Sequence, residues 1–442
     1  MRLLVSSSPW SLARWLPAVV GELLERGTEL VFAGPEGTDP LPESAHGHPN
    51  VSVVELPFDP PRGPITDVRL FRALSDLVRF YRPELAGAEW PRRRTAQRVL
   101  DFAGHPDGRE AATRLAAVQV PPEAQAKAEG VLSAIEQHVP AESRLSAAVE
   151  ALDVDAVLLV SRCSLGGAER DLLKVARALE LPSLMLVWSW DNLSSKAVLH
   201  EHPDHLLVWN ELQVDEAERL QGFPRERVYA LGAPSFDAFF AALDQVERPA
   251  RDGRTILYLG SSKNISREEP EVVFPGWLAA VRAAPDPLVR DAKIVVRPYP
   301  GGGAWRRWRP EASDFTVERG KKLAPAGLAR ALAGVDAVVA LNTSGELEAA
   351  IAGLPVVTFR AGAGAPGQEG SVHFRYLLEQ NGGFVIDSRD LDEHVQNLAR
   401  VLRGEHDRER QRAFLESFVR PRGLDRPVSP VVADTILEHA AR

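Results

Sequence analysis

Cysteine is almost absent from this sequence of 442 residues, in which Cys163 is the single thiol. One thiol excludes an internal disulfide framework and a cysteine-based zinc site. Long apolar runs are missing too, because no stretch approaches the roughly 18–20 residues that a membrane-spanning helix needs. The net charge of −9 argues against general nucleic-acid binding. We therefore expect a protein of the reducing cytoplasm with no nucleic-acid partner and no transmembrane segment, and we expect Cys163 to be a buried structural thiol.

A glycine-rich phosphate loop is missing from the first strand. The strand predicted over Arg2–Val5 leads into Ser6-Ser7-Ser8-Pro9, so the Gly-x-Gly-x-x-Gly fingerprint of dinucleotide-binding folds is absent. The same stretch interrupts what would be the apolar core of a signal peptide. We interpret the N-terminus as the first strand, loop and helix of the fold. No metal ligand pattern accompanies His46 and His48, and we expect no metal ion.

Short apolar runs alternate with helical stretches along most of the chain. The predicted strands are Arg2–Val5, Glu29–Ala33, Val51–Leu56, Asp155–Val160, Ser183–Trp188, His205–Trp209, Val228–Leu231, Thr255–Leu259, Lys293–Arg297, Val335–Leu341 and Val356–Phe359. Helices are predicted over Leu12–Arg26, Cys163–Leu179, Glu211–Gln221, Trp277–Ala284, Glu346–Ala352, Ser371–Gly383, Leu391–Leu402, Arg408–Val419 and Pro430–Ala441, and Gly301–Trp308 is a predicted loop. This alternation is typical of α/β folds with doubly wound parallel sheets.

The length predicts two domains of about 200 residues each. Asp244–Arg254 is charged and contains a proline and a glycine, as linkers often do. We therefore expect an N-terminal domain over 1–246 and a C-terminal domain over 252–420. The last helix, within 421–442, is long enough to return to the N-terminal domain.

The segment 65–152 has a different character, because it is helical and rich in Ala, Arg and Glu. It is predicted to be a helical insertion in the N-terminal domain. Its arginines are Arg69, Arg72, Arg79, Arg82, Arg92, Arg93, Arg94 and Arg98. They could face an anionic acceptor or a membrane surface, or they could lie on a solvated insertion. The seven acidic residues among them, between Asp67 and Glu110, favour the solvated insertion.

One stretch, VDAVVALNTSGELEAAIAGLPVVTFR from Val335 to Arg360, reads as strand, loop, helix and strand. Its loop, Asn342-Thr343-Ser344-Gly345, has the chemistry of a turn and a helix cap. Such a loop at the carboxyl end of a parallel strand suits an anion, and Glu348, one helical turn further on, could hold a ribose diol. A well-capped helix in an ordinary αβ unit would give the same pattern.

Within this stretch, LEAAIAGLPVV resembles the donor-site helix of GT-B-fold glycosyltransferases. The spacing of Ser344, Glu348 and Pro355 is also similar to CDP-glycerol glycerophosphotransferases, and UDP-GlcNAc 2-epimerases share a related version. Retaining GT-B enzymes often carry a second glutamate eight residues before the ribose-binding one, where this chain has Ala340. The resemblance therefore implies donor binding more firmly than a particular reaction.

A second block, from Trp190-Asp191-Asn192-Leu193 to Gly232-Ala233-Pro234, resembles the end of the N-terminal domain in GT-B proteins, especially a bacterial group found near polysaccharide genes. Together the two blocks imply two Rossmann-like domains in a GT-B arrangement. They also imply a glycosyltransferase that moves a sugar from a nucleotide-sugar to a hydroxyl acceptor in polysaccharide or glycoconjugate biosynthesis. Such an enzyme would act in the cytoplasm or at the inner face of the membrane.

The resemblance also implies where the donor would bind. Four loops of the C-terminal domain follow parallel strands, at the edge where open α/β sheets bind ligands. The expected donor-binding residues are Ser261, Ser262, Lys263, Arg297, Asn342, Thr343, Ser344, Glu348 and Gln368. Lys263 and Arg297 would neutralise the diphosphate, although each could equally be a solvated or structural charge.

Three residues could carry catalysis. Asp191 follows two tryptophans at a strand end, where a carboxylate could act as a base, although an Asx turn would explain it as well. Glu369 and His373 lie near the donor loops, and the histidine could carry a proton near neutral pH. No metal or other cofactor is needed for this scheme. A nucleotide-sugar 2-epimerase, a glycerol-phosphate transferase and a catalytically inactive nucleotide-binding protein remain open alternatives.

Overall fold

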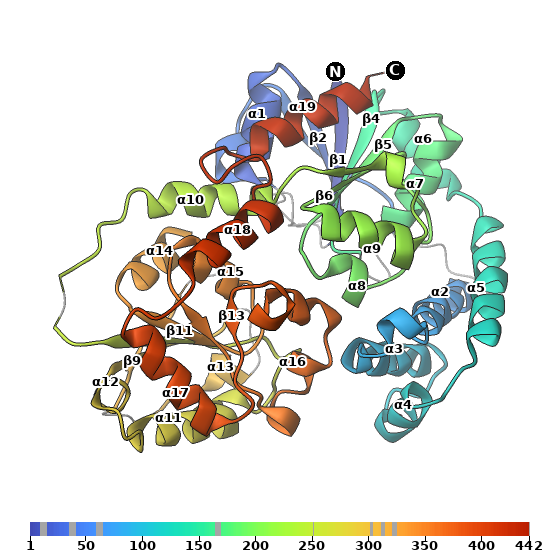
Figure 1. Ribbon diagram of the computed structural model, residues 1–442. Helices are drawn as coiled ribbons and strands as arrows, with labels where there is room; N and C mark the ends of the chain where they lie inside the picture. The colour runs from blue at the N-terminus through green and yellow to red at the C-terminus, as the bar shows by residue number, and fades with distance from the viewer. Residues whose placement is uncertain are drawn as a thin grey trace. The chain divides into compact units, whose positions relative to one another are not determined.

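A computed structural model describes residues 1–8, 16–34, 41–58, 65–163, 169–250, 252–300, 304–310, 314–320 and 325–441. The chain forms two compact units, of which the first comprises Met1–Asp237 with Phe418–Arg442 and the second Ala238–Ser417. Each is built around a parallel β-sheet (Figure 1). The predicted α/β class with two doubly wound parallel sheets is confirmed.

The sheet of the first unit has seven strands in the order β3-β2-β1-β4-β5-β6-β7. They span β1 Arg2–Ser8, β2 Glu29–Gly34, β3 Val51–Glu55, β4 Ala156–Ser161, β5 Ser183–Val187, β6 His205–Val208 and β7 Val228–Ala230. Every pair is parallel, with Leu3 opposite Leu30 on one side and Ala156 on the other. The chain therefore starts at β1, fills one half of the sheet, and returns to β4 to fill the other half.

Helices cover both faces of this sheet because its strands are apolar on both faces. Alternate strand residues such as Leu3 and Leu158 pack with α1 (Pro17–Glu25) and α19 (Ser429–Ala440). The intervening residues, such as Leu4 and Val157, pack with helices α6 (Ser143–Glu150), α7 (Glu169–Ala178) and α9 (Glu211–Gln221). The C-terminal helix α19 lies beside α1, within the first unit (Figure 1).

The insertion is a small helical body with a core of its own. It consists of α2 (Ile65–Arg79), α3 (Glu89–Phe102), α4 (Arg109–Ala116) and α5 (Pro122–Gln137). Small and branched side chains, including Ala73, Leu77, Ala96 and Val99, form its core. Helix α6 was expected in the same insertion, but its Leu145 and Val149 pack in the core beneath the sheet. The separate helical body therefore ends with α5.

The arginines of the insertion are largely turned inward, which corrects the expectation of a solvated insertion. Arg79 is fully buried and donates to the carbonyls of Leu193 (2.8 Å) and Lys196. Arg82 donates to the carbonyl of Arg219, at 2.9 Å. Arg72 and Arg94 also bond within the unit, Arg72 to Glu136 and Arg94 to Ser195. The bonds of Arg79, Arg82 and Arg94 fasten the insertion to the segment after β5 and to α9, whereas the Arg72–Glu136 bond joins α2 to α5 within it. We therefore do not propose an arginine-rich membrane face.

The second unit contains a six-stranded parallel sheet in the order β10-β9-β8-β11-β12-β13. Its strands are β8 Thr255–Leu259, β9 Lys293–Arg297, β10 Thr316–Val317, β11 Ala337–Ala340, β12 Val356–Val357 and β13 Val385–Ile386. Its helices are α10 Asp237–Leu243, α11 Phe274–Arg282, α12 Pro287–Arg290, α13 Ala304–Arg307, α14 Pro325–Ala333, α15 Gly345–Ile351, α16 Pro366–Glu369, α17 Leu391–Leu402 and α18 Arg408–Phe418. Phe274, Trp277 and Leu398 belong to the core that covers one face of this sheet.

Several predicted elements differ from the structure. The segment 371–383 is not an α-helix but two short 3₁₀ turns, Val372–Leu377 and Glu379–Asn381. They are separated by Leu378, which forms a parallel bridge to Val385 and is therefore extended. A short helix, α13, occupies part of the predicted loop Gly301–Trp308. The helices predicted over Leu12–Arg26 and Cys163–Leu179 lie partly outside the described residues, and Cys163 itself is buried beyond the end of β4. Along the described ranges, no helix is both long and apolar enough to cross a bilayer.

Candidate functional site

The order of strands in the second sheet reverses between β8 and β11. From β8 the chain passes to β9 and β10 on one side, whereas β11, β12 and β13 extend the sheet on the other side. Leu259 and Ala340, the last residues of β8 and β11, lie opposite each other. In open parallel α/β sheets, ligands bind outside the carboxyl ends of the strands at such a switch point. The loops after β8, β9 and β11 all leave the sheet at this edge.

A buried carboxylate organises the loop after β8. Glu269 is fully buried and accepts hydrogen bonds from the Tyr258 hydroxyl (3.1 Å), the Trp305 indole (3.1 Å) and the amide of Ser261 (2.9 Å). The Ser261 hydroxyl donates to Glu269 as well. Gly260 lies so close to Trp305 that a Cβ would stand 2.6 Å from the indole ring. Because Ser261 is fully buried and both of its donors serve Glu269, we leave it out of the candidate site.

Ser262 and Lys263 lie on the exposed part of the same loop. The Ser262 carbonyl accepts from the amides of Ile265 (2.9 Å) and Ser266 (3.2 Å), which closes a tight turn. Lys263 is exposed at the tip and forms no ion pair with any described residue. Its ammonium group is therefore available to an anion.

Arg297, the last residue of β9, is buried beside the switch point. Its carbonyl accepts from the Gly260 amide at 2.9 Å, which holds the ends of β8 and β9 together. Its guanidinium pairs with Glu318, whose side chain is 42% exposed. The guanidinium also packs against Gly320, where a Cβ would stand 2.6 Å from Cζ. Glu318 and Gly320 thus fix the orientation of the planar Arg297 guanidinium group, and a fixed orientation favours the paired hydrogen bonds by which arginine binds phosphate.

The loop after β11 is fastened to the first turn of α15. The Thr343 amide donates to the Glu346 carboxylate at 3.0 Å, and Ser344 stands at the N-cap position of the helix. Ser344 is exposed and makes no capping bond, contrary to its expected role as a cap. Asn342 is only 4% exposed, and its Nδ2 has no hydrogen-bond partner among the described residues. A buried amide donor without a partner is unusual and could serve a ligand.

Two glutamates of α15 have strongly raised pKa values. Burial raises the pKa of Glu346 to about 8. Burial also raises the pKa of Glu348 to about 7, and the positive charge of Arg297 limits that rise. Arg297 and Glu348 therefore lie within electrostatic range of each other at the switch point. Carboxyl groups with pKa values shifted toward neutrality are typical of functional sites.

The segment around α16 holds the remaining predicted residues of the second unit. Gln368 is fully buried, and its amide binds the Thr358 hydroxyl and the Phe359 carbonyl, each at 3.0 Å. Glu369 is exposed and pairs with Arg360 at 2.5 Å. His373 is 7% exposed. The predicted contact of Gln368 with a donor is therefore replaced by a structural role, whereas Glu369 remains accessible.

Asp191 lies in the first unit, after the carboxyl end of β5. Its carboxylate binds the Lys196 ammonium at 2.6 Å and the Asn192 amide at 3.0 Å. The Ser195 hydroxyl donates to it at 3.1 Å. The Asp191 side chain keeps 16% of its surface exposed. The residue therefore forms an ion pair and side-chain hydrogen bonds at the edge of the sheet, and its side chain makes no capping bond to the short helix Asn192–Ser195.

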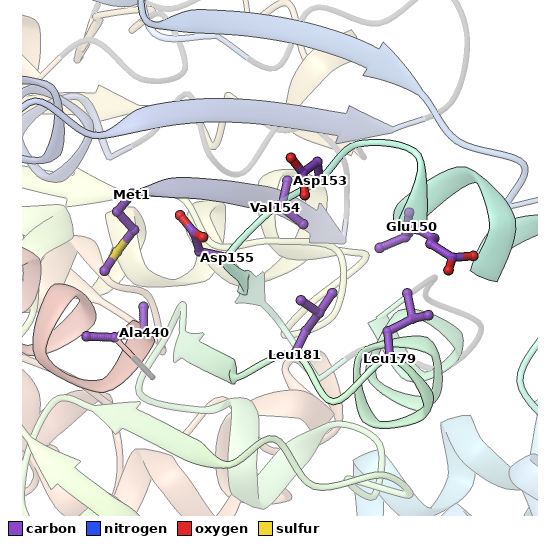
Figure 2. A pocket seen from close by; sticks show the side chains of 10 residues that line it. Met1, Glu150, Asp153, Val154, Asp155, Leu179, Leu181 and Ala440 are labelled. Carbon is purple, nitrogen blue, oxygen red and sulfur yellow. The ribbon is translucent and has the colours of Figure 1, made fainter.

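The hollow shown in Figure 2 lies elsewhere, at the amino ends of β1, β4 and β5. It has a volume of about 550 Å³ and is lined by apolar side chains such as Leu179 and Leu181 and by the acids Glu150, Asp153 and Asp155. Parallel sheets bind ligands at the opposite edge, so this hollow is not the candidate site. Nowhere in the described ranges do three His, Cys, Asp or Glu side chains gather as a metal site would need.

No family model and no curated protein matches this sequence. Solved structures, however, match both units together. They include the glycotransferase of kitacinnamycin (12% identity, TM-score 0.52, 99% of this chain and 98% of that chain). They also include UDP-GlcNAc 2-epimerase from Methanocaldococcus jannaschii (10%, 0.51, 99% and 100%) and UGT89C1 from Arabidopsis thaliana (14%, 0.50, 99% and 99%). The chain has the GT-B fold. At these identities the likeness concerns the fold alone.

Two buried glutamates of this GT-B chain were not predicted from the sequence. Glu346 had a signal, because Thr343-Ser344-Gly345-Glu346 has the spacing of a capping box. Glu269 had none, because its partners lie between 8 and 36 residues away. Both side chains are fully buried beneath the loops of the switch point. They hold these loops by hydrogen bonds to the amides of Ser261 and Thr343.

Substitution of Glu346 by glutamine is expected to reduce the loss of stability that this GT-B chain suffers as the pH rises. The pKa of Glu346 is about 8 in the folded state and near 4.5 in the unfolded state, so the folded state binds the proton more tightly. Protonated Glu346 therefore makes its full contribution to the free energy of unfolding at pH values below the unfolded pKa. This contribution, roughly 3–5 kcal/mol, is lost as the pH rises through about 8. Glutamine imitates the protonated side chain at every pH.

Urea unfolding at about pH 5 and about pH 8 measures this effect as the difference between the two free energies of unfolding. Glu271→Gln is the matched control, because Glu271 is an exposed glutamate of the same unit. If Glu346→Gln and Glu271→Gln lose the same stability over this range, Glu346 does not have the raised pKa.

Proposed function

We propose that this protein is a glycosyltransferase that moves a sugar from a nucleotide-sugar donor to a hydroxyl group of an acceptor. The observation that carries the proposal is the placement of Arg297, at the end of β9, and Glu348, in the helix after β11, within electrostatic range of each other beside the switch point of the second sheet. A buried, oriented guanidinium suits a diphosphate, and a carboxyl group suits the hydroxyls of a ribose. The UDP-GlcNAc 2-epimerase of Neisseria meningitidis, bound to UDP-GlcNAc, and UGT89C1, bound to UDP, have the same fold.

In the proposed donor site, Arg297 and Lys263 bind the diphosphate and Glu348 binds the ribose. Asn342 offers its free Nδ2 donor, and Ser262, Thr343 and Ser344 supply hydroxyl groups from the loops at the same edge. The charges of Arg297 and Lys263 would stabilise the leaving diphosphate as its bond to the sugar lengthens. No metal or other cofactor is part of this proposal.

In the proposed reaction, the acceptor oxygen attacks the anomeric carbon of the donor sugar. The bond between that carbon and the diphosphate oxygen breaks, and the nucleoside diphosphate leaves with the electron pair. The acceptor hydroxyl gives its proton to a base. Asp191 is the proposed base, because it is a partly exposed carboxylate in the first unit, with Glu369 and His373 as further candidates in the second. The expected product belongs to polysaccharide or glycoconjugate biosynthesis in the cytoplasm.

Two other activities on the same fold would need different reactants. A nucleotide-sugar 2-epimerase would convert UDP-GlcNAc without any acceptor, and a glycerol-phosphate transferase would use CDP-glycerol. Incubation with each nucleotide alone, followed by chromatography, separates these activities from glycosyl transfer. If the protein binds nucleotides but converts none of them, it is a catalytically inactive nucleotide-binding protein.

Ser344→Ala and Glu348→Ala are each expected to weaken the binding of nucleoside diphosphates by about tenfold while leaving the fold intact. Both side chains are at least partly exposed at the switch point, so truncating them leaves no cavity in the core. Calorimetric titration with UDP, CDP and GDP measures the effect, and a thermal melt confirms the fold. Exposed Glu271→Ala is the control. Unchanged affinity in both variants would remove this loop from the donor site.

A further inference from the structure

Four basic side chains converge at the carboxyl edge of the first sheet. Arg94 and Arg98 lie one turn apart on α3, Arg162 follows β4 directly, and Lys196 follows the short helix α8 (Asn192–Ser195). Two hydrogen bonds bring these segments together. Arg94 donates to the Ser195 carbonyl at 2.8 Å, and the Ala197 amide donates to the Cys163 carbonyl at 2.8 Å.

Most of this basic cluster has no partner of its own. Arg98 and Arg162 are half-buried, yet neither forms a hydrogen bond or an ion pair with any residue that the structure describes. The Nε of Arg94 and the hydroxyl of Ser194, a residue only 1% exposed, are buried and have no hydrogen-bond partner among the described residues. Elsewhere in the insertion, Arg72 pairs with Glu136, and Arg79 donates to backbone carbonyls although its Nε has no partner among the described residues. The cluster therefore has donors that the described chain does not use.

Its charges also repel one another. Burial lowers the pKa of Arg94, and Arg98 and Arg162 lower it further. Burial likewise lowers the pKa of Lys196, against the attraction of Asp191 and with the help of Arg94 and Arg162. Asp191 and Asp76 attract these basic groups, but Asp76 also attracts Arg79 and Arg170. Half-buried guanidinium groups that repel one another destabilise a fold unless a bound anion neutralises their charge.

The position of the cluster suits a ligand. The order of the first sheet reverses between β1 and β4, and Arg162 is the first residue after β4. This is the edge and the kind of switch point at which parallel sheets bind ligands. Guanidinium forks match the paired oxygens of phosphates and carboxylates.

We propose that Arg94, Arg98, Arg162 and Lys196 form a site for an oxyanion, a phosphate or a carboxylate, carried by the acceptor substrate. That the anion belongs to an acceptor rests on the proposed function, whereas the oxyanion site itself does not. Asp191 is bound to Lys196, so the anion would be held next to the proposed base. The acceptor would thus be selected by its negative charge.

The test uses the full chain with inorganic phosphate and with acetate as probes, titrated by thermal shift at constant ionic strength. Arg162→Gln and Arg98→Gln are compared with Arg93→Gln, an exposed arginine on the same helix α3. We expect each of the first two variants to weaken probe binding by at least about tenfold, and Arg93→Gln to have no effect. Without a probe their melting temperatures should equal or exceed that of the wild type, because repulsion is removed.

Preferential binding of phosphate points to a phosphorylated acceptor, and preferential binding of acetate to one with a carboxylate. Affinity that is unchanged in both Arg162→Gln and Arg98→Gln, or lost only in Arg297→Gln, overturns the inference. UDP titrated into the same variants keeps the two proposals apart. If UDP binding is weakened in Arg297→Gln but phosphate and acetate binding is unchanged in Arg162→Gln and Arg98→Gln, the oxyanion site is wrong and the donor site stands. If phosphate or acetate binding depends on Arg162 but the chain binds no nucleotide, the donor site is wrong and the oxyanion site stands.

Discussion

Replacement of Arg297 by glutamine is expected to weaken the binding of nucleoside diphosphates by about a hundredfold, or roughly 3 kcal/mol. Arg297 is 9% exposed at the end of β9, and its charge influences Glu348 across the switch point. A diphosphate bound there would exchange hydration for a guanidinium fork that Glu318 and Gly320 already orient. Such charge-assisted, desolvated contacts are the strongest that a phosphate makes. No other single residue of the proposed donor site should have so large an effect.

Calorimetric titration with UDP, CDP and GDP measures this loss. Arg297→Lys keeps the charge without the fork, and we expect its affinity to lie between those of the wild type and Arg297→Gln. Arg290→Gln is the control, because Arg290 is an exposed arginine of the same unit that pairs with its neighbour Asp291. Equal affinity of Arg297→Gln and Arg290→Gln for a nucleotide that the wild type binds would show that the diphosphate lies elsewhere.

Most strands of the two sheets could be predicted from the sequence, because a buried parallel strand is encoded by a short run of consecutive apolar residues. The strands β8 and β9 have the predicted limits, Thr255–Leu259 and Lys293–Arg297. Helix α17 also has its predicted limits, Leu391–Leu402, because Asp390 caps it and accepts from the Glu393 amide at 2.9 Å. These signals lie within a few residues of the element that they define.

The roles of polar side chains were harder to predict because their partners are distant in sequence. Arg79 binds the carbonyl of Leu193, 114 residues away, and Arg94 that of Ser195, 101 residues away. Composition alone suggested a solvated arginine-rich insertion. Gln368 likewise resembled a sugar contact, but its side chain is fully buried and donates its amide hydrogens to Thr358 and Phe359. A residue type can suit a ligand and still serve the fold, and only the three-dimensional partners decide.

Substitution of Asp237 by alanine is expected to destabilise the first unit by roughly 3–5 kcal/mol. Asp237 is 7% exposed and binds the Arg420 guanidinium at 2.7 Å. The same carboxylate accepts from the amides of Val428 (2.9 Å) and Ser429 (2.8 Å), and from the Ser429 hydroxyl (2.7 Å). It therefore caps α19 from a distant part of the chain and compensates a buried arginine.

Alanine would leave Arg420 without its buried carboxylate and the first amides of α19 without their acceptor. The free energy of unfolding in urea measures the loss, and Asp244→Ala is the control, because Asp244 is exposed shortly after α10. Trypsin gives an independent readout, since Arg420, Arg422 and Arg426 lie between α18 and α19 and should be cut faster once α19 detaches. Unfolding free energies that agree within about 1 kcal/mol for the two variants would contradict the role of Asp237. The apolar contacts of α19 with α1 and with the strands beneath it would then hold the helix in place.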